Sequence, residues 1–325
     1  MRKIVIGAII ALAAGVTSIW YFNYVKKPVS QTLPTYFTYT PEEIETLNAL
    51  NSREIINQTD LFKWDETLFR LVSKNKIPDT VASRIYANVL VAQHDAAFLS
   101  FNGKGIFMGN IDMVSKKAAC LFFPNECSSL VAESDEYSEE LARLVIKKIE
   151  NRLAEENARP ENYELKTGKD YWSGFQPSIG IETKGWNTWF LKSRDQFRVS
   201  PPSFGVTPND FAGQLALVKK AISEVTDGQK QSVVFWAGGP GTKTPPGQWL
   251  QLADDYIKTQ NISLEKALVV RHMVAASIAD AVLAVFDSKY TYQIKRPFML
   301  DNSILTIMPT PNHPSYPAGH ATLSA

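Results

Sequence analysis

Two stretches near the C-terminus decide how this chain is interpreted: KYTYQIKRP at residues 289–297 and PTPNHPSYPAGHAT at residues 309–322. Lys289 and Arg296 are seven residues apart, so the sequence predicts that both project from one face of a helix that Pro297 ends. Arginine supplies a planar fork of donors and lysine a compact charge, and together they can hold a tetrahedral oxyanion. On its own, such a pair is usually a solvated helix surface.

The second stretch adds a backbone donor and a histidine to these two cations. Gly319 has no side chain, so its N–H can approach a ligand closely. His320 follows it and can hold or transfer a proton near neutral pH. Two cations, a bare amide and a histidine suit an oxyanion with a leaving oxygen to protonate, and this combination indicates a site.

The order of these residues resembles the signature of the type 2 phosphatidic acid phosphatase and vanadium haloperoxidase superfamily. That signature has lysine, six residues, Arg-Pro and a later Pro-Ser-Gly-His-like element. HPSYPAGHAT, with WAGGPGTKTPPGQW at 236–249 and FLKSRDQFRVSPP at 190–202, looks more like the haloperoxidase branch than the lipid phosphatases. The resemblance covers roughly residues 60–325. It implies an all-α, helical-bundle fold that is incomplete at the C-terminus.

The resemblance also implies roles for the matching positions. Lys289 and Arg296 would bind the equatorial oxygens of vanadate, or of phosphate in its place, and the N–H of Gly319 would add a hydrogen bond. His320 would be the acid–base group. His313, the second catalytic candidate, falls where bromoperoxidase-like members carry a histidine, which favours bromide or iodide. Phe286 falls where haloperoxidases often have a tryptophan near the halide.

Two departures from the family pattern bear on activity. Ala318 replaces the usual serine, which removes one hydroxyl donor to the oxyanion. The family's third motif, with an arginine and the histidine that binds vanadium or becomes phosphorylated, lies downstream of the last position here, so we expect a C-terminally truncated copy with negligible turnover. Three functions stay open: a haloperoxidase using hydrogen peroxide and a halide, an acid phosphatase acting on phosphate esters, and a non-catalytic helical domain.

Other acidic and histidine residues show no metal-binding pattern. His94 and His272 are interpreted as structural or surface residues, and Asp280 and Asp287, on one helix face, as ion-pair partners rather than a metal pair. We see no cluster with zinc spacing.

Apolar periodicity predicts a mostly helical chain with one or two bundles. The expected helices are 79–101, with Asp79 as its cap, then 138–157, 208–226, 229–237, 248–259 and 263–289. Residues 158–206 are predicted to be a long ordered loop, and 238–247 a break between helices.

The N-terminus differs in composition from the rest of the chain. Residues 4–22 carry no charge and have aromatic residues at their far end, which predicts a transmembrane signal anchor over 1–27. A cleaved signal peptide is the alternative. We expect a tether over 28–59, ending in a short helix that starts near Thr40-Pro41, and one helical domain over 60–325.

Charge and cysteine content narrow the partners and the compartment. A net charge of +1, with 34 basic and 33 acidic residues, gives no electrostatic footprint for nucleic acid. Cys120 and Cys127 either form a short disulfide loop or are two buried thiols. With the anchor, they favour a membrane-tethered or secreted domain on the extracytoplasmic, periplasmic side. Expected partners are small-molecule substrates, the membrane and, as in many family members, a second copy in a homodimer.

Overall fold

The computed structural model describes residues 35–52, 54–101, 106–133, 135–158, 161–202 and 211–325. Within these ranges the chain is helical, and extended pairing is confined to isolated bridges such as that between Ile55 and Met108. The predicted all-α class is therefore confirmed. The elements are α2 (Pro41–Asn48), α3 (Gln58–Lys74), α4 (Asp79–Leu99), α5 (Ile111–Cys120), η1 (Pro124–Ser129), α6 (Glu136–Ala158), η2 (Ile181–Gly185), α7 (Ala212–Ser223), α8 (Asp227–Ala237), α9 (Thr244–Thr259), α10 (Leu264–Tyr292), α11 (Pro297–Leu300) and α12 (Gly319–Ser324).

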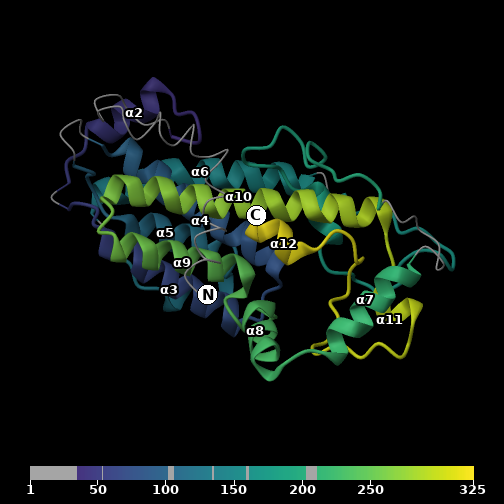
Figure 1. Ribbon diagram of the computed structural model, residues 1–325. Coiled ribbons are helices and arrows are strands. Elements are labelled where there is room, and N and C mark those ends of the chain that lie inside the picture. Colours follow the sequence, from purple (N-terminus) through teal and green to yellow (C-terminus); the bar gives the residue numbers. More distant parts are fainter. Residues whose placement is uncertain (1–34, 53, 102–105, 134, 159–160, 203–210) are drawn as a thin grey trace.

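The centre of the bundle is formed by α4 and α10. The long helix α10 runs across most of the molecule, with α9 beside it and α12 at its flank (Figure 1). α4 packs against α10, α9, α5 and α6. On α4 the polar residues Ser83, Asn88 and Gln93 are buried as well as the apolar ones. A helix enclosed on all sides is a core helix, and its polar groups need internal partners.

A buried charge network connects four helices of this core. The guanidinium of Arg271 on α10 donates to Asp65 of α3, to Asp254 of α9 (3.3 Å) and to Gln93 of α4 (3.1 Å). Burial, followed by the charge of Asp65, raises the pKa of Asp254 to about 9. Burial and the neighbouring carboxylate thus both favour the protonated form of Asp254 beside Arg271.

The described part of the predicted tether lies against this bundle. Thr40 caps α2 in a reciprocal arrangement with Glu43, so the predicted helix start is confirmed. Just before it, the N–H groups of Tyr36 and Phe37 donate to the carboxylate of Asp95 on α4, at 2.6 and 2.9 Å. The anchor predicted over residues 1–27 lies outside the described residues, and the domain boundaries stay predictions.

One described stretch, Leu264–Leu300, is long and apolar enough to cross a membrane by length and composition alone. It contains α10, whose apolar window is 61% buried inside the protein. Its apolar character therefore serves the packing against α4.

Most helix predictions are close to the structure, with differences at the ends. Asp79 is the first residue of α4 rather than its cap, which is Pro78. α9 begins at Thr244, inside the predicted break, because Pro245 and Pro246 fit the first turn of a helix. In residues 161–202 the structure contains only η2, so the predicted long loop is confirmed. A disulfide joins Cys120 at the end of α5 to Cys127 in η1, which settles the two alternatives for these cysteines.

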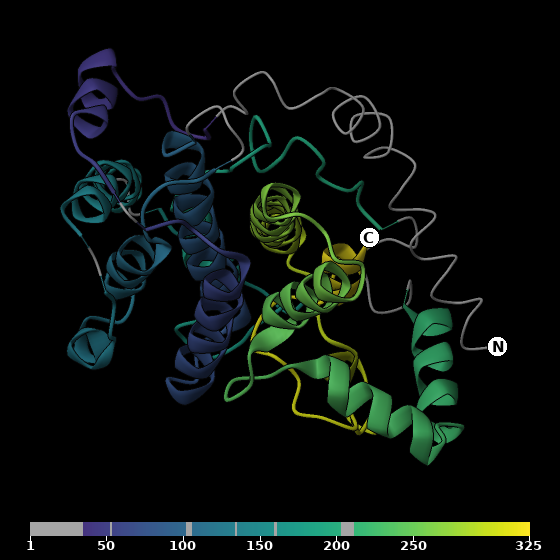
Figure 2. The same cartoon turned by 90° about the vertical axis from the view of Figure 1, so that its left-hand side faces the viewer.

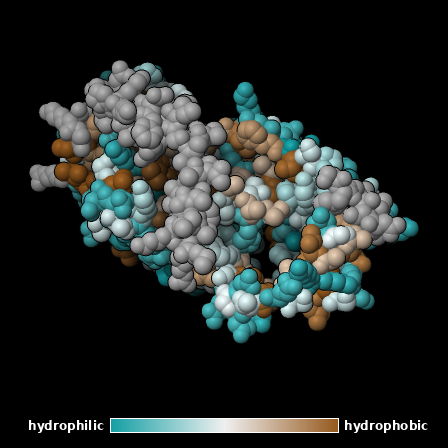
Figure 3. Space-filling view, in the orientation of Figure 1, coloured by the Kyte–Doolittle hydropathy of each residue, from teal (hydrophilic) through white to brown (hydrophobic). Residues whose placement is uncertain are grey.

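The pair α7 and α8 stands away from the bundle (Figure 2). Neither helix has a buried residue in the structure, and α8 packs against α9. Hydrophobic residues reach the surface at the lower right of the space-filling view (Figure 3). The exposed apolar residues of α7 and α8 include Leu217, Val234 and Phe235.

Candidate functional site

The two predicted oxyanion-binding cations come from different elements. α10 ends at Tyr292, and Gln293 follows it with φ of +52°, the left-handed conformation that turns the chain. The Gln293 N–H donates to the Lys289 carbonyl (2.7 Å) and so closes the helix. Arg296 lies beyond this turn as the N-cap of α11, which Pro297 begins. The prediction of one shared helix face was therefore wrong.

Lys289 is buried at the end of α10, with 1% of its surface exposed. Its ammonium donates to three backbone carbonyls of one segment, those of Pro314 (3.0 Å), Ser315 (2.9 Å) and Pro317 (2.5 Å). Burial, followed by the charge of Arg296, lowers the pKa of Lys289 to about 7. Three acceptors match the three donors of an ammonium group, so the geometry is that of the protonated form.

Arg296 reaches the same segment from the other side. Its Nε–H donates to the carbonyl of His313 (2.7 Å), and its Nη2 donates to Nδ1 of the His313 ring (2.8 Å). Burial, followed by the charges of Lys289 and Arg296, lowers the pKa of His313 to about 3, so its ring is neutral at neutral pH. The ring lies edge-on to Phe286, with 5.1 Å between centroids. Lys289, Arg296, His313 and Phe286 therefore meet around residues 311–317.

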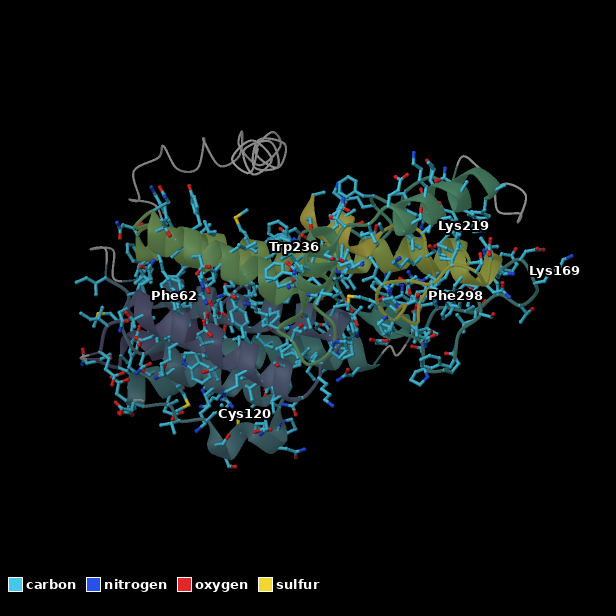
Figure 4. All side chains as sticks on the ribbon, turned by 60° about the horizontal axis from the view of Figure 1, so that its bottom comes forward. Phe62, Cys120, Lys169, Lys219, Trp236 and Phe298 are labelled. Atoms are coloured by element: carbon cyan, nitrogen blue, oxygen red, sulfur yellow. A yellow bond between two sulfur atoms is a disulfide. The ribbon has the colours of Figure 1, made fainter. Side chains whose placement is uncertain are left out.

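Gly319 and His320 follow this segment and open the short helix α12. The space beside Gly319 is open, because a Cβ built there would meet no atom within 4 Å. His320 is exposed, and its Nε2–H donates to the carbonyl of Trp236 at the end of α8 (2.9 Å). Trp236 lies near the middle of the molecule beside α9, where its ring is 5.9 Å from that of Trp249 (Figure 4). The contact fixes the tautomer of His320 and leaves Nδ1 to accept or hold a proton.

Asp79 is an acidic neighbour of this site that the sequence did not reveal. Burial raises its pKa, while the charges of His320 and Lys289 act on it in the opposite direction. Asp79 is thus the acidic group whose field reaches both the lysine and the histidine. It lies at the start of α4, far from both in sequence, and the only local signal was its suitability for a helix start.

Two carboxylates on α10 hold the loop beside the site. Asp280 accepts from the backbone N–H groups of residues 189, 190 and 191, at 2.7, 2.7 and 2.9 Å. Asp287 forms a two-bond ion pair with Arg198, at 2.5 and 2.9 Å. The ion-pair interpretation is therefore confirmed for Asp287, whereas Asp280 acts as an acceptor for the backbone. Among the described residues no group of acidic, histidine or cysteine side chains could hold a metal ion.

The remaining histidines form a stacked pair inside the bundle. The rings of His94 on α4 and His272 on α10 have centroids 3.9 Å apart. Burial, followed by the charge of His94, lowers the pKa of His272 to about 3. Both residues are buried, which agrees with the structural interpretation of them.

The charge of the site suits an oxyanion, but its donors are already engaged. All three donors of Lys289, and the Nε and Nη2 groups of Arg296, are directed at residues 311–317. Vanadate or phosphate would have to take these donors from the carbonyl oxygens. The residues therefore fit a tetrahedral oxyanion in charge and in donor type, provided that the 311–317 segment shifts.

Comparison with solved structures finds a similar fold. The structure is similar to that of a protein described as the first bacterial vanadium-dependent iodoperoxidase, with a TM-score of 0.63 and 20% sequence identity over 83% of this chain and 80% of that chain. No family model and no curated protein matches the chain. At this identity the likeness concerns the fold alone. The chain therefore has the all-α, helical-bundle fold of a vanadium haloperoxidase.

Proposed function

We propose that the protein is a vanadate-dependent haloperoxidase-type enzyme that oxidises iodide or bromide with hydrogen peroxide. One observation carries the proposal. Lys289 and Arg296, from two different elements, converge on the segment that leads directly to Gly319 and His320, within a fold similar to that of a vanadium iodoperoxidase. The hydrogen-bond partners of these two cations are neutral carbonyl and imidazole groups. A bound anion would offset their buried charge, so the pair indicates an anion site.

Each residue then has a distinct part in the proposed site. Lys289, Arg296 and the N–H of Gly319 would hold the oxygens of vanadate, which when bound supplies a Lewis acid for peroxide activation. His320 would accept or return a proton at Nδ1, since its other ring nitrogen donates to Trp236. His313 is neutral and accepts from Arg296, so it would orient the guanidinium.

We further propose that the domain works outside the cytoplasm. The disulfide between Cys120 and Cys127 supports this location, because disulfides persist in oxidising compartments. The signal anchor over residues 1–27 remains part of the same proposal.

The proposal is tested with a chain that also carries the family's third motif downstream of these residues, loaded with orthovanadate. Iodide oxidation is followed as triiodide absorbance after addition of peroxide. We expect oxidation that depends on vanadate and is lost in Lys289→Met. The matched control is Lys266→Met, because Lys266 is an exposed lysine on the same helix.

Two other outcomes of these assays would support the alternative functions, an acid phosphatase or a non-catalytic domain. Release of phosphate from an ester, with no halide oxidation, would identify an acid phosphatase. Phosphate or vanadate binding by calorimetry without either reaction would identify a non-catalytic oxyanion-binding domain. If neither oxyanion binds, the assignment of this site is wrong.

A further inference from the structure

An apolar cavity of about 280 Å³ lies against the candidate oxyanion site. One side is the loop over residues 190–199, and the floor is α10. Two of its lining residues adjoin the candidate site: Pro317, whose carbonyl accepts from Lys289, and Thr322, two residues after His320 on α12. The side chains that argue for a ligand are Phe190, Phe197 and Val199 in the wall and Ala281 and Ala284 in the floor.

The wall of this cavity is fixed in place. Asp280 holds the loop at one end through three backbone N–H groups, and Asp287 holds it at the other end through Arg198. The hydroxyl groups of Tyr292 and Tyr316 add bonds to the carbonyls of residues 199 and 200, at 2.6 and 2.9 Å. A preformed cavity costs little ordering entropy when a ligand binds.

Two aromatic side chains in the wall of the cavity are exposed to solvent rather than packed in the core. Phe190 and Phe197 are 48% and 66% exposed, although both lie within the pinned loop. Exposed apolar side chains that gather at a hollow are typical of binding sites. An aromatic ring placed between them would remove this surface from water.

The polar lining indicates a ligand without charge. The carboxylate of Asp280 is engaged by three N–H groups, and the hydroxyl of Ser288 donates to the carbonyl of Ala284 (3.1 Å). The hydroxyl of Thr322 likewise donates to the carbonyl of Ala318 (3.0 Å). A charged group placed among these satisfied side chains would lose its hydration without gaining partners.

We propose that this cavity binds a compact, uncharged aromatic molecule. A dry cavity of about 150 Å³ accommodates benzene, so the larger volume here suits a substituted single ring or a fused pair of rings. Its polar substituent would point to the open mouth.

The position of the cavity gives this ligand a use, which rests on the function proposed above. An aromatic molecule held there lies beside the groups that would generate the oxidised halogen. It would be the acceptor in the balanced reaction ArH + X⁻ + H₂O₂ + H⁺ → ArX + 2 H₂O. In this step the C–H bond of the ring is replaced by a carbon–halogen bond, and peroxide is reduced to water.

Binding is tested on the full chain without vanadate or peroxide, by titrating 2-naphthol and following its fluorescence. We expect saturable binding to the wild type, with 2-naphthoate, its charged analogue, binding at least about tenfold more weakly. Ala284→Leu, which fills the floor, should weaken 2-naphthol by about tenfold or more. Phe197→Ala, an exposed change that leaves the core intact, should weaken it by roughly threefold to tenfold.

The matched control is Ala216→Leu, the same substitution on the exposed face of α7, and its affinity should equal that of the wild type. Saturable binding that Ala284→Leu and Phe197→Ala both leave unchanged would overturn the proposal. The absence of saturable binding would also overturn it. The same holds if no ligand binds and Phe197→Ala instead dissociates a dimer. Because no peroxide or vanadate is present, binding of 2-naphthol by a protein that oxidises no halide would sink the proposed function and leave this inference standing.

Discussion

Replacement of Lys289 by methionine removes the charge that ties residues 314–317 to the end of α10. Methionine keeps most of the apolar stem and can occupy the same buried channel. It cannot donate to the carbonyls of Pro314, Ser315 and Pro317. Ser315 and Pro317 are only partly buried, so water can reach their carbonyls, whereas Pro314 is buried and its carbonyl would lose its partner.

The size of the effect follows from two opposing contributions. Hydrogen bonds to a charged group stabilise by about 1.5–3 kcal/mol each, and Lys289 makes three of them. Against this, burial and then the charge of Arg296 lower the pKa of Lys289 from 10.5 to about 7, which corresponds to a net cost of about 5 kcal/mol for the charged form. The difference favours the lysine by roughly 2 kcal/mol. For a domain of this length that corresponds to a decrease in Tm of roughly 3 °C.

Two measurements check this value. Thermal unfolding followed by circular dichroism should show the decrease for Lys289→Met and none for Lys266→Met. Hydrogen exchange at the Ser315 N–H, which donates to the carbonyl of Ile294 (2.9 Å), should accelerate in Lys289→Met alone. An unchanged Tm together with unchanged exchange at Ser315 would refute the conclusion that the lysine holds this segment.

Three further changes test the buried groups and the disulfide. Asp254 has a raised pKa of about 9, so the folded state keeps a proton that the unfolded state loses as the pH rises. The free energy of unfolding should therefore fall between pH 4 and pH 9. In urea titrations, Asp254→Asn should make this pH dependence weaker. His272 has a lowered pKa of about 3, so stability should be lost as the pH falls from 6.5 toward 3; acid unfolding of His272→Phe that matches the wild type would contradict this. Cys120→Ser opens the loop to Cys127 and should cost about 2 kcal/mol in denaturant unfolding, whereas a loss that reductant fails to reproduce in the wild type would point to another cause.

Local signals in the sequence predicted much of the fold. The capping pattern at Thr40 and the apolar period of α4 depend on neighbours a few residues away, and both helices are present. The end of α10 was misplaced, because Gln293 rather than glycine adopts the left-handed conformation there. The side-chain amide of Gln293 donates to the carbonyl of Glu164, in a loop that no local pattern connects to α10.

The candidate site could be predicted only in part for the same reason. Spacing alone indicated that Lys289 and Arg296 cooperate, and they do converge, although through a turn rather than along a helix. The pairs that shape the surroundings join residues far apart in sequence: Asp287 with Arg198, and Asp280 with the backbone of residues 189–191. Such pairs are set by the packing of whole helices, so composition and periodicity carry no signal for them.

The contacts of Lys289 make anion binding and the fold of the 311–317 segment mutually dependent. An oxyanion needs the same Lys289 N–H donors that are now hydrogen-bonded to the carbonyls of Pro314, Ser315 and Pro317. Saturating phosphate should therefore release this segment, and the Ser315 N–H should exchange faster with phosphate than without it, although ligands usually slow exchange. Lys289→Met, whose segment is already released, should show no such acceleration. Slower exchange at Ser315 in the wild type would mean that the oxyanion binds beside the carbonyls rather than in their place.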